Sequence, residues 1–368
     1  MREGVERRLF VAATNQNDGK TTCSLGFVNG FRGLAGSIGF IKPVGQRYVM
    51  VEGQQIDEDS LLIQLGCGLR CPLRDMSPVA IPKNFTREFL DDPERLYPKL
   101  EADIRTSFGR AAEGNDLVVI EGTGHAGVGS VLGLSNARVA RILDAKVVIV
   151  TLGGIGRPVD EVALNCSLFE KESVPVVGVV ANKVLPEKLD QTRHYLTKAF
   201  DRCGLRLLGV IPFQPRLAWP TVQQVADAMD AQILNGHDCL GNEIASMLVG
   251  AMMPHNALTY VREKSLLIVP GDRDDLVLAI LSMQLLRRGA GLSGILFTGG
   301  LRPQPQTMEL VCCTDTPVLA TKALTYEAAA GINDMIVKIC LTDEHKIELA
   351  NSLVREHVDL ETLWAALA

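Results

Sequence analysis

The chain has 368 residues, of which 47% are apolar and 22% charged, and its formal net charge is −6. This length predicts two or three domains with a core that needs no disulfides, and the acidic balance argues against nucleic acid or an anionic membrane as a partner. No apolar stretch approaches the roughly 20 residues of a membrane span, and the charged N-terminus lacks the pattern of a signal peptide, so we expect a cytoplasmic protein.

The first half of the chain alternates short apolar runs with helical patterns. Each run has the length and β-branched content of a strand and precedes a turn signal; the runs are residues 8–14, 37–42, 117–121, 146–151, 175–181 and 207–211. Helical patterns lie between them, for example at residues 21–34 and 134–143. This alternation predicts an α/β fold with a parallel sheet covered by helices on both faces. Functional sites in such folds lie at the carboxyl ends of the strands.

A proline-rich segment at residues 214–220 interrupts this rhythm, and a second, smaller α/β set follows it. Its predicted elements are a helix at residues 222–234, a strand at 265–270, an amphipathic helix at 274–288, and strands at 294–298 and 317–321. Residues 343–368 have a helical pattern. We therefore predict two domains, residues 1–220 and 221–340, followed by a helical tail at 341–368.

The first loop carries a phosphate-binding motif. Residues 14–21 fit the P-loop pattern except that Thr14 replaces the first glycine, and a strand precedes the loop while a helix follows it. Backbone N–H groups at the start of that helix can cradle phosphate oxygens, and Lys20 can reach the β and γ phosphates. The alternative is an ordinary turn before a helix. The candidate nucleotide-binding residues are Asn15, Gln16, Asn17, Asp18, Gly19, Lys20, Thr21 and Thr22.

Magnesium would need oxygen ligands near this loop. The Thr21 hydroxyl is one candidate ligand, and Mg²⁺ usually takes one or two carboxylates in addition. Glu121 ends a predicted strand, which favours a role at the metal, and the alternative is a solvated charge at the strand end. Asp57 and Asp59 are weaker candidates, because a surface acidic turn explains them equally well.

Asn182 follows the fifth predicted strand and is a candidate for reading the base. An asparagine amide can pair with the N6 and N7 atoms of adenine. The guanine motif of GTPases would need an aspartate where this chain has Leu185, so adenine is favoured over guanine. The alternative is an ordinary loop residue.

These motifs resemble those of dethiobiotin synthetase and follow one another in the same order along the chain. They resemble still more the dethiobiotin-synthetase-like N-terminal region of long phosphate acetyltransferases, because Gln46 follows the Lys-Pro-Val segment. The resemblance covers residues 8–220, and residues 221–335 resemble the DRTGG domain that comes next in those proteins. The pieces that carry it are residues 10–22, 42–46, 121–124, 182 and 211–212 in the first region, and 250–252, 270–275 and 296–300 in the second.

The resemblance implies a P-loop NTPase-type fold, a homodimer and a set of roles. Lys20, Thr21 and Lys42 would contact ATP phosphates or an acidic substrate, Asp57 or Asp59 would hold Mg²⁺ with Glu121, and Asn182 would read adenine. In the synthetase the lysine matching Lys42 lies near the carbamate that attacks the γ-phosphate. The bulky residues 46–48 do not match the pocket for diaminopelargonate. The chain ends near where the acyl-transferring domain would begin, so acetyl transfer is not expected.

Two functions remain open at this point. The first is an ATPase or ATP-dependent ligase that activates a small carboxylate or carbamate, with Lys20 and Lys42 as catalytic residues. The second is a non-catalytic, nucleotide-sensing regulatory protein. In the second domain, the loops at residues 272–274 and 298–300 follow predicted strands and are either a further site or tight structural turns.

Overall fold

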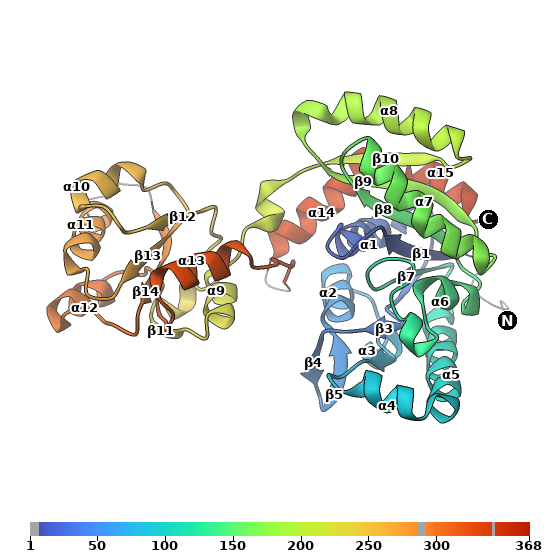
Figure 1. The fold of residues 1–368 in the computed structure, drawn as a ribbon, viewed down its shortest axis with the longest axis horizontal. Helices are drawn as coiled ribbons and strands as arrows, with labels where there is room; N and C mark the ends of the chain where they lie inside the picture. The colour runs from blue at the N-terminus through green and yellow to red at the C-terminus, as the bar shows by residue number, and fades with distance from the viewer. Residues whose placement is uncertain (1–6, 286–290, 341–342) are drawn as a thin grey trace. The chain divides into compact units, whose positions relative to one another are not determined.

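The computed structural model describes residues 7–285, 291–340 and 343–368. The chain divides into two compact units (Figure 1). The first unit comprises Met1–Gln214 together with Glu344–Ala368, and the second comprises Pro215–Asp343. The second unit is thus inserted between two segments of the first.

The first unit is built on a six-stranded sheet with strand order β10-β9-β8-β1-β7-β2, in which every neighbouring pair is parallel. The β-branched, apolar runs form these strands because both faces of a parallel sheet are buried. All six predicted strands are present: β1 (Arg7–Ala13), β2 (Ile38–Ile41), β7 (Leu117–Glu121), β8 (Lys146–Leu152), β9 (Val176–Val184) and β10 (Leu207–Pro212).

Helices cover both faces of this sheet, as predicted. On one face Phe10 and Ala12 of β1 pack in a core with α5 (Pro93–Ala112), α6 (Asn136–Ile142), α7 (Gly156–Lys171) and α8 (Leu189–Arg202). The alternate residues Leu9 and Val11 are equally buried, and they point to the opposite face. There α1 (Lys20–Gly30) and α14 (Glu344–His357) contact the sheet.

The segment between β2 and β7 supplies residues that the site uses. It contains the short strands β3 (Val44–Gly45), β4 (Tyr48–Val51), β5 (Gln54–Asp57) and β6 (Val79–Ala80), and the helices α2 (Glu58–Cys67), α3 (Leu73–Met76) and α4 (Phe85–Asp91) before α5. Among the described residues, no helix has both the length and the apolar character needed to cross a membrane.

The helical tail predicted for residues 341–368 packs within the first unit; residues 341–342 lie outside the described part. Helix α14 lies directly on α1, where a Cβ added to Gly26 would come within 2.2 Å of the Val354 Cβ. The Asn29 Nδ2 of α1 also donates a hydrogen bond of 2.9 Å to Asn351 Oδ1. Helix α15 (Leu360–Ala366) follows α14. The tail therefore packs over one face of α1.

The second unit is the smaller α/β domain that the sequence predicts. Its five-stranded sheet has the order β11-β15-β14-β13-β12 and is parallel except for β11. The strands are β11 (Gln232–Asn235), β12 (Ser246–Val249), β13 (Ser265–Pro270), β14 (Leu292–Thr298) and β15 (Val318–Ala320); the helices are α9 (Val222–Ala228), α10 (Pro254–Ala257), α11 (Asp274–Leu285), α12 (Pro305–Cys312) and α13 (Thr325–Asn333).

One predicted element of the second unit is wrong. The helix expected at residues 222–234 ends at Ala228, and residues 232–235 instead form β11, which pairs with β15. Asp230 has a φ of 45°, a left-handed conformation that breaks a helix. Ile233 is apolar because it lies in strand β11 and packs against the core of the second unit. The helix expected at 274–288 is present to Leu285, and its last residues lie outside the described part.

Candidate functional site

The predicted P-loop joins the end of β1 to the start of α1. At this turn Gly19 has a φ of 104°, a conformation that strongly favours glycine. A Cβ on Gly19 would also lie 2.0 Å from the Asn182 Nδ2. No side chain caps the amino end of α1. The first N–H groups of α1 are therefore left without a side-chain acceptor at a position that suits an anion.

The carboxylate of Asp18 holds this loop in shape. Its Oδ2 accepts hydrogen bonds from Thr14 Oγ1 at 2.7 Å and from the Asn15 backbone N at 2.6 Å. The Thr14 hydroxyl also lies 3.2 Å from Thr151 Oγ1 of β8. The threonine that replaces the usual first glycine thus contacts Asp18 within the loop and Thr151 of the neighbouring strand β8. The Asp18 side chain points into the loop, so only its backbone is suited to a phosphate.

Asn182 and Lys183, at the end of β9, fasten the other side of the loop. Asn182 Nδ2 donates to the Asp18 carbonyl at 2.8 Å, and Lys183 Nζ donates to the Asn17 carbonyl at 2.7 Å. The Asn182 Oδ1 accepts from the Lys183 backbone N at 2.8 Å, which leaves one N–H and one lone pair of the amide for any other partner. Lys183 was not singled out from the sequence, although it adjoins Asn182.

Lys20 is buried at the start of α1, with its Nζ 3.4 Å from the Asn15 carbonyl oxygen. Burial lowers the pKa of this ammonium; the nearby Glu121 and Asp18 carboxylates oppose that effect, and Lys42 adds to it. A weakly compensated cation in such a place gains from an approaching anion.

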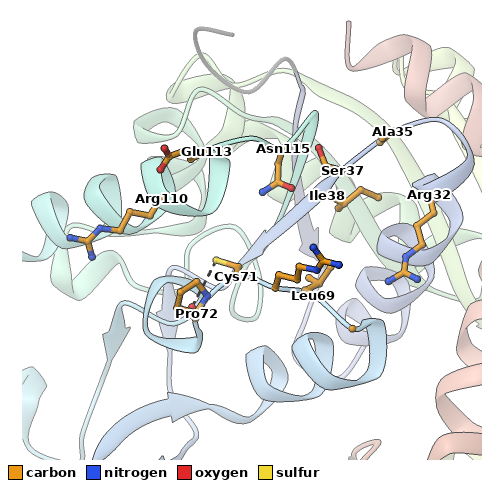
Figure 2. A pocket seen from close by; sticks show the side chains of 13 residues that line it. Arg32, Ala35, Ser37, Ile38, Leu69, Cys71, Pro72, Arg110, Glu113 and Asn115 are labelled. Atoms are coloured by element: carbon orange, nitrogen blue, oxygen red, sulfur yellow. Dashed lines mark hydrogen bonds between the residues drawn. The ribbon is translucent and has the colours of Figure 1, made fainter. Parts of the chain in front are cut away.

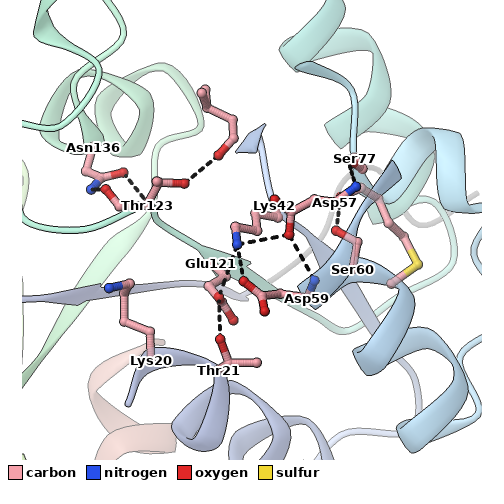
Figure 3. A network of polar contacts seen from close by, with 12 residues as sticks. Lys20, Thr21, Lys42, Asp57, Asp59, Ser60, Ser77, Glu121, Thr123 and Asn136 are labelled. Atoms are coloured by element: carbon pink, nitrogen blue, oxygen red, sulfur yellow. Dashed lines mark hydrogen bonds and ion pairs between the residues drawn. The ribbon is translucent and has the colours of Figure 1, made fainter. Parts of the chain in front are cut away.

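Lys42, directly after β2, lies among three carboxylates (Figure 3). Its Nζ donates to Asp59 Oδ2, lies 3.0 Å from Asp57 Oδ1 and lies 3.7 Å from Glu121 Oε1. Asp57 caps α2 by accepting from the Asp59 backbone N at 2.9 Å. The exposed fractions of Asp57, Asp59 and Glu121 are 1%, 6% and 1%. The alternatives of a surface acidic turn and a solvated strand end are therefore wrong.

The charges of this cluster do not balance. Burial alone would lower the pKa of Lys42, but Asp59, Glu121 and Asp57 outweigh it and raise that pKa. Burial raises the pKa of Asp57 and of Glu121, with Lys42 acting in the opposite direction. The Asp57 Oδ2 and Glu121 Oε2 atoms are buried without a hydrogen-bond partner among the described residues. The cluster thus retains carboxylate oxygen that a further cation can neutralise.

Thr21 and Glu121 fit a magnesium ion better than the other two predicted ligands, Asp57 and Asp59. Thr21 Oγ1 donates to Glu121 Oε1 at 3.0 Å, and Glu121 Oε2 meets no hydrogen-bond donor within normal bonding distance in the described part of the chain. Asp57 and Asp59 are instead paired with Lys42. No group of three or more His, Cys, Asp or Glu residues among the described residues could hold a metal ion by itself. The arrangement fits an octahedral ion that keeps most of its water and takes only one or two protein oxygens.

The loop after β7 is fixed by Asn136 of α6. Asn136 Oδ1 accepts from the Thr123 backbone N at 3.0 Å, and its Nδ2 donates to the Thr123 and His125 carbonyls at 2.8 and 2.7 Å. The Thr123 hydroxyl donates to the Val44 carbonyl. These bonds hold the segment that follows Glu121 against the segment that follows Lys42.

In the second unit, the loops considered for a further site are tied by internal contacts. Arg273 donates to the Gly250 and Met252 carbonyls at 3.0 and 3.1 Å and forms an ion pair with Asp275. The Asp274 Oδ1 accepts from the Gln304 backbone N at 2.9 Å. These contacts favour a tight structural turn over a binding site at residues 272–274.

Comparisons with known proteins agree with this two-part architecture. A family model of an AAA domain matches residues 7–221, and one of a DRTGG domain matches residues 224–335. The phosphate acetyltransferase of Nitrosomonas europaea is 28% identical over 96% of this chain and 51% of its own length. That of Pseudomonas putida is 29% identical over 95% of this chain and 50% of its own length. The chain thus spans about half the length of these relatives. The solved MinC:MinD cell division protein complex of Aquifex aeolicus matches with a TM-score of 0.35 and 15% identity, over 57% of this chain and 83% of that one.

Proposed function

The chain belongs to the AAA domain family, with a DRTGG domain after the AAA domain, and from this premise we propose that its first unit binds Mg-ATP through the P-loop at residues 14–21. The observation that carries the proposal is the amino end of α1. It has no side-chain cap, and the buried ammonium of Lys20 lies beside it. Main-chain N–H groups, the helix dipole and Lys20 together suit a triphosphate.

In this proposal the residues around the P-loop contact the magnesium ion, the phosphates and the adenine base. Thr21 and Glu121 would hold Mg²⁺, which when bound neutralises charge on the phosphate oxygens. The backbone from Asn15 to Thr22 would surround the phosphates. Asn182 would use the remaining polar atoms of its amide for adenine, while Lys183 keeps the loop closed through Asn17.

The activity we propose is ATP-dependent activation of a small carboxylate or carbamate. An oxygen of that substrate attacks the γ-phosphorus, ADP leaves, and an amine then displaces phosphate from the mixed anhydride. Lys20 would stabilise the charge on the transferred phosphoryl group, and Lys42 would hold the substrate anion. Support comes from the chain of contacts that runs from Thr21 through Glu121 to Lys42.

A second candidate is a nucleotide sensor without turnover. The observation that favours it is the enclosure of Lys42, because the cation that would hold a substrate is already paired with Asp59 and Asp57. The pairing of a P-loop domain with a DRTGG domain also suits a regulatory role.

One assay separates these candidates. Phosphate release from Mg-ATP is measured alone and with candidate carboxylates, or with diamines plus CO₂, and ATP binding is measured by calorimetry. Turnover that depends on an added substrate supports the activating enzyme, and tight binding without turnover supports the sensor. Lys20→Ala should abolish ATP binding while the circular dichroism spectrum stays unchanged; unaltered affinity in this variant rejects the P-loop site itself.

A further inference from the structure

A cavity of about 720 Å³ opens in the first unit, at the edge of the sheet opposite the P-loop (Figure 2). It lies at the amino end of β2, at Ser37 and Ile38, whereas the P-loop follows the carboxyl end of β1. Because the strands are parallel, the two sites lie at opposite ends of the strands. Its volume is in the range of small-molecule sites, roughly 300–1,000 Å³. None of the residues assigned to the nucleotide site lines it.

Three arginines line this cavity: Arg32 after α1, Arg70 after α2 and Arg110 near the end of α5. Figure 2 shows Arg32 and Arg110 on opposite sides of it. Arg110 Nη1 lies 3.0 Å from Asp75 Oδ1, so its charge is compensated. Arg32 donates to the Cys67 carbonyl, which is uncharged. Arg70 forms no hydrogen bond or ion pair with the part of the chain that the structure describes. Arg32 and Arg70 thus line the cavity, both exposed and without a carboxylate partner among the described residues.

A purely structural role explains only one of these two charges. The carboxyl end of a helix attracts cations, and α2 ends at Cys67, whose carbonyl Arg32 caps. Arg70 lies beyond the last turn of α2 and caps nothing in the described structure. The single carboxylate that lines the cavity, Glu113, does not balance Arg32 and Arg70 together. A ligand with more than one negative charge would pair with both of these exposed guanidinium groups.

Three elements connect this cavity with the nucleotide site. Helix α1 begins at Lys20 and leads into Arg32; helix α2 begins after its cap Asp57 and leads into Arg70; strand β2 begins at the cavity and leads into Lys42. An α-helix of 11 residues is about 16 Å long, so the two sites are separate but share rigid elements. The contact between Arg32 and the Cys67 carbonyl joins the cavity ends of the two helices.

We propose that this cavity binds a small polyanion bearing phosphate or carboxylate groups, with Arg32 and Arg70 as its cationic contacts. The planar fork of a guanidinium group pairs with both kinds of oxyanion. The site stands independently of the proposed ATP activity, because none of its residues belongs to the P-loop.

The test measures binding of pyrophosphate and, separately, of citrate by calorimetry at low ionic strength. The Lys20→Ala variant is the background, so that a weakened P-loop does not supply the signal. Arg70→Ala is introduced into that background, because Arg70 is exposed and its loss leaves no buried partner. Arg87→Ala in α4 is the matched control, since it removes the same charge from an exposed position away from the cavity.

We expect at least one of the two anions to bind, about tenfold or more weakly after Arg70→Ala and unchanged after Arg87→Ala. Pyrophosphate alone would identify phosphate groups as the ligand chemistry, and citrate alone would identify carboxylates. Absence of binding by both anions, or equal loss in the two arginine variants, overturns the proposal. The comparison of Arg70→Ala with Arg87→Ala assigns the signal to the cavity even if Lys20→Ala still binds ATP, so the two proposals fail separately.

Discussion

Replacing Lys42 by methionine tests whether the buried charge cluster depends on its single central ammonium. Methionine keeps most of the apolar stem and removes the charge. The side chains of Lys42, Asp57, Asp59 and Glu121 are exposed by only 7%, 1%, 8% and 1%, so the three carboxylates would stay buried without their counter-charge. Breaking a buried ion pair on one side costs about 3–5 kcal/mol. We expect a loss of that order in the free energy of unfolding at pH 7.5.

The pH dependence has a definite sign. Burial raises the pKa of Asp57 and Glu121 in the folded protein, and removal of Lys42 would raise it further. The folded state therefore binds more protons than the unfolded state between the unfolded pKa, about 4, and the higher folded value. The free energy of unfolding falls as the pH rises through that window. The difference between Lys42→Met and wild type should consequently be smaller at pH 5 than at pH 7.5.

The assay is urea unfolding in a Trp219→Phe background with EDTA present. Trp364 lies in the first unit and Trp219 in the second, so the remaining tryptophan reports the unit that holds the cluster. Lys83→Met, at an exposed lysine, controls for loss of one positive charge. A loss below about 1 kcal/mol, or a loss that is equal at both pH values, would refute the reasoning about the cluster.

Three further predictions concern the loop and the helix that follows it, and a fourth concerns a glycine of α5 as a comparison. ATP should bind more tightly than GTP in competitive calorimetry, and equal affinities would remove the base-reading role of Asn182. Gly19→Ala should weaken ATP binding, because its Cβ would lie 2.0 Å from Asn182 Nδ2 at a φ of 104°; unchanged binding would contradict the loop geometry. Gly26→Ala should destabilise the first unit by about 1–3 kcal/mol through contact with Val354. Gly109→Ala in α5, which meets nothing within 4 Å, should stabilise it by about 0.5–1 kcal/mol in the same urea assay.

The parallel sheet was predictable because its signals are local. Each strand buries both faces, so its run of β-branched residues is visible in the sequence without knowledge of its neighbours. The P-loop is equally local, since strand, glycine, lysine and helix follow one another. The helix predicted at residues 222–234 failed because the apolar pattern at Ile233 serves a sheet contact with β15, which no local pattern reports.

The details of the site depended on contacts between distant residues. The sequence pointed to Asp57, Asp59, Glu121 and Lys42 as separate candidates, but not to their convergence on one ammonium group. The bonds from Thr14 to Thr151 and from Lys183 to Asn17 join residues 137 and 166 positions apart. Asn182 was suggested as a candidate only by its place directly after a predicted strand.

The packing of α14 on α1 has a practical consequence for any attempt to dissect this protein. A fragment cut at residue 220 looks like a whole nucleotide-binding domain on the linear map, yet it lacks Val354 and the rest of the surface that closes over Gly26 and Gly30. Expression of such a fragment would leave an apolar groove open along the helix that begins with Lys20. A faithful isolated domain would instead be made by excising residues 215–343 and rejoining the two flanking segments with a flexible linker.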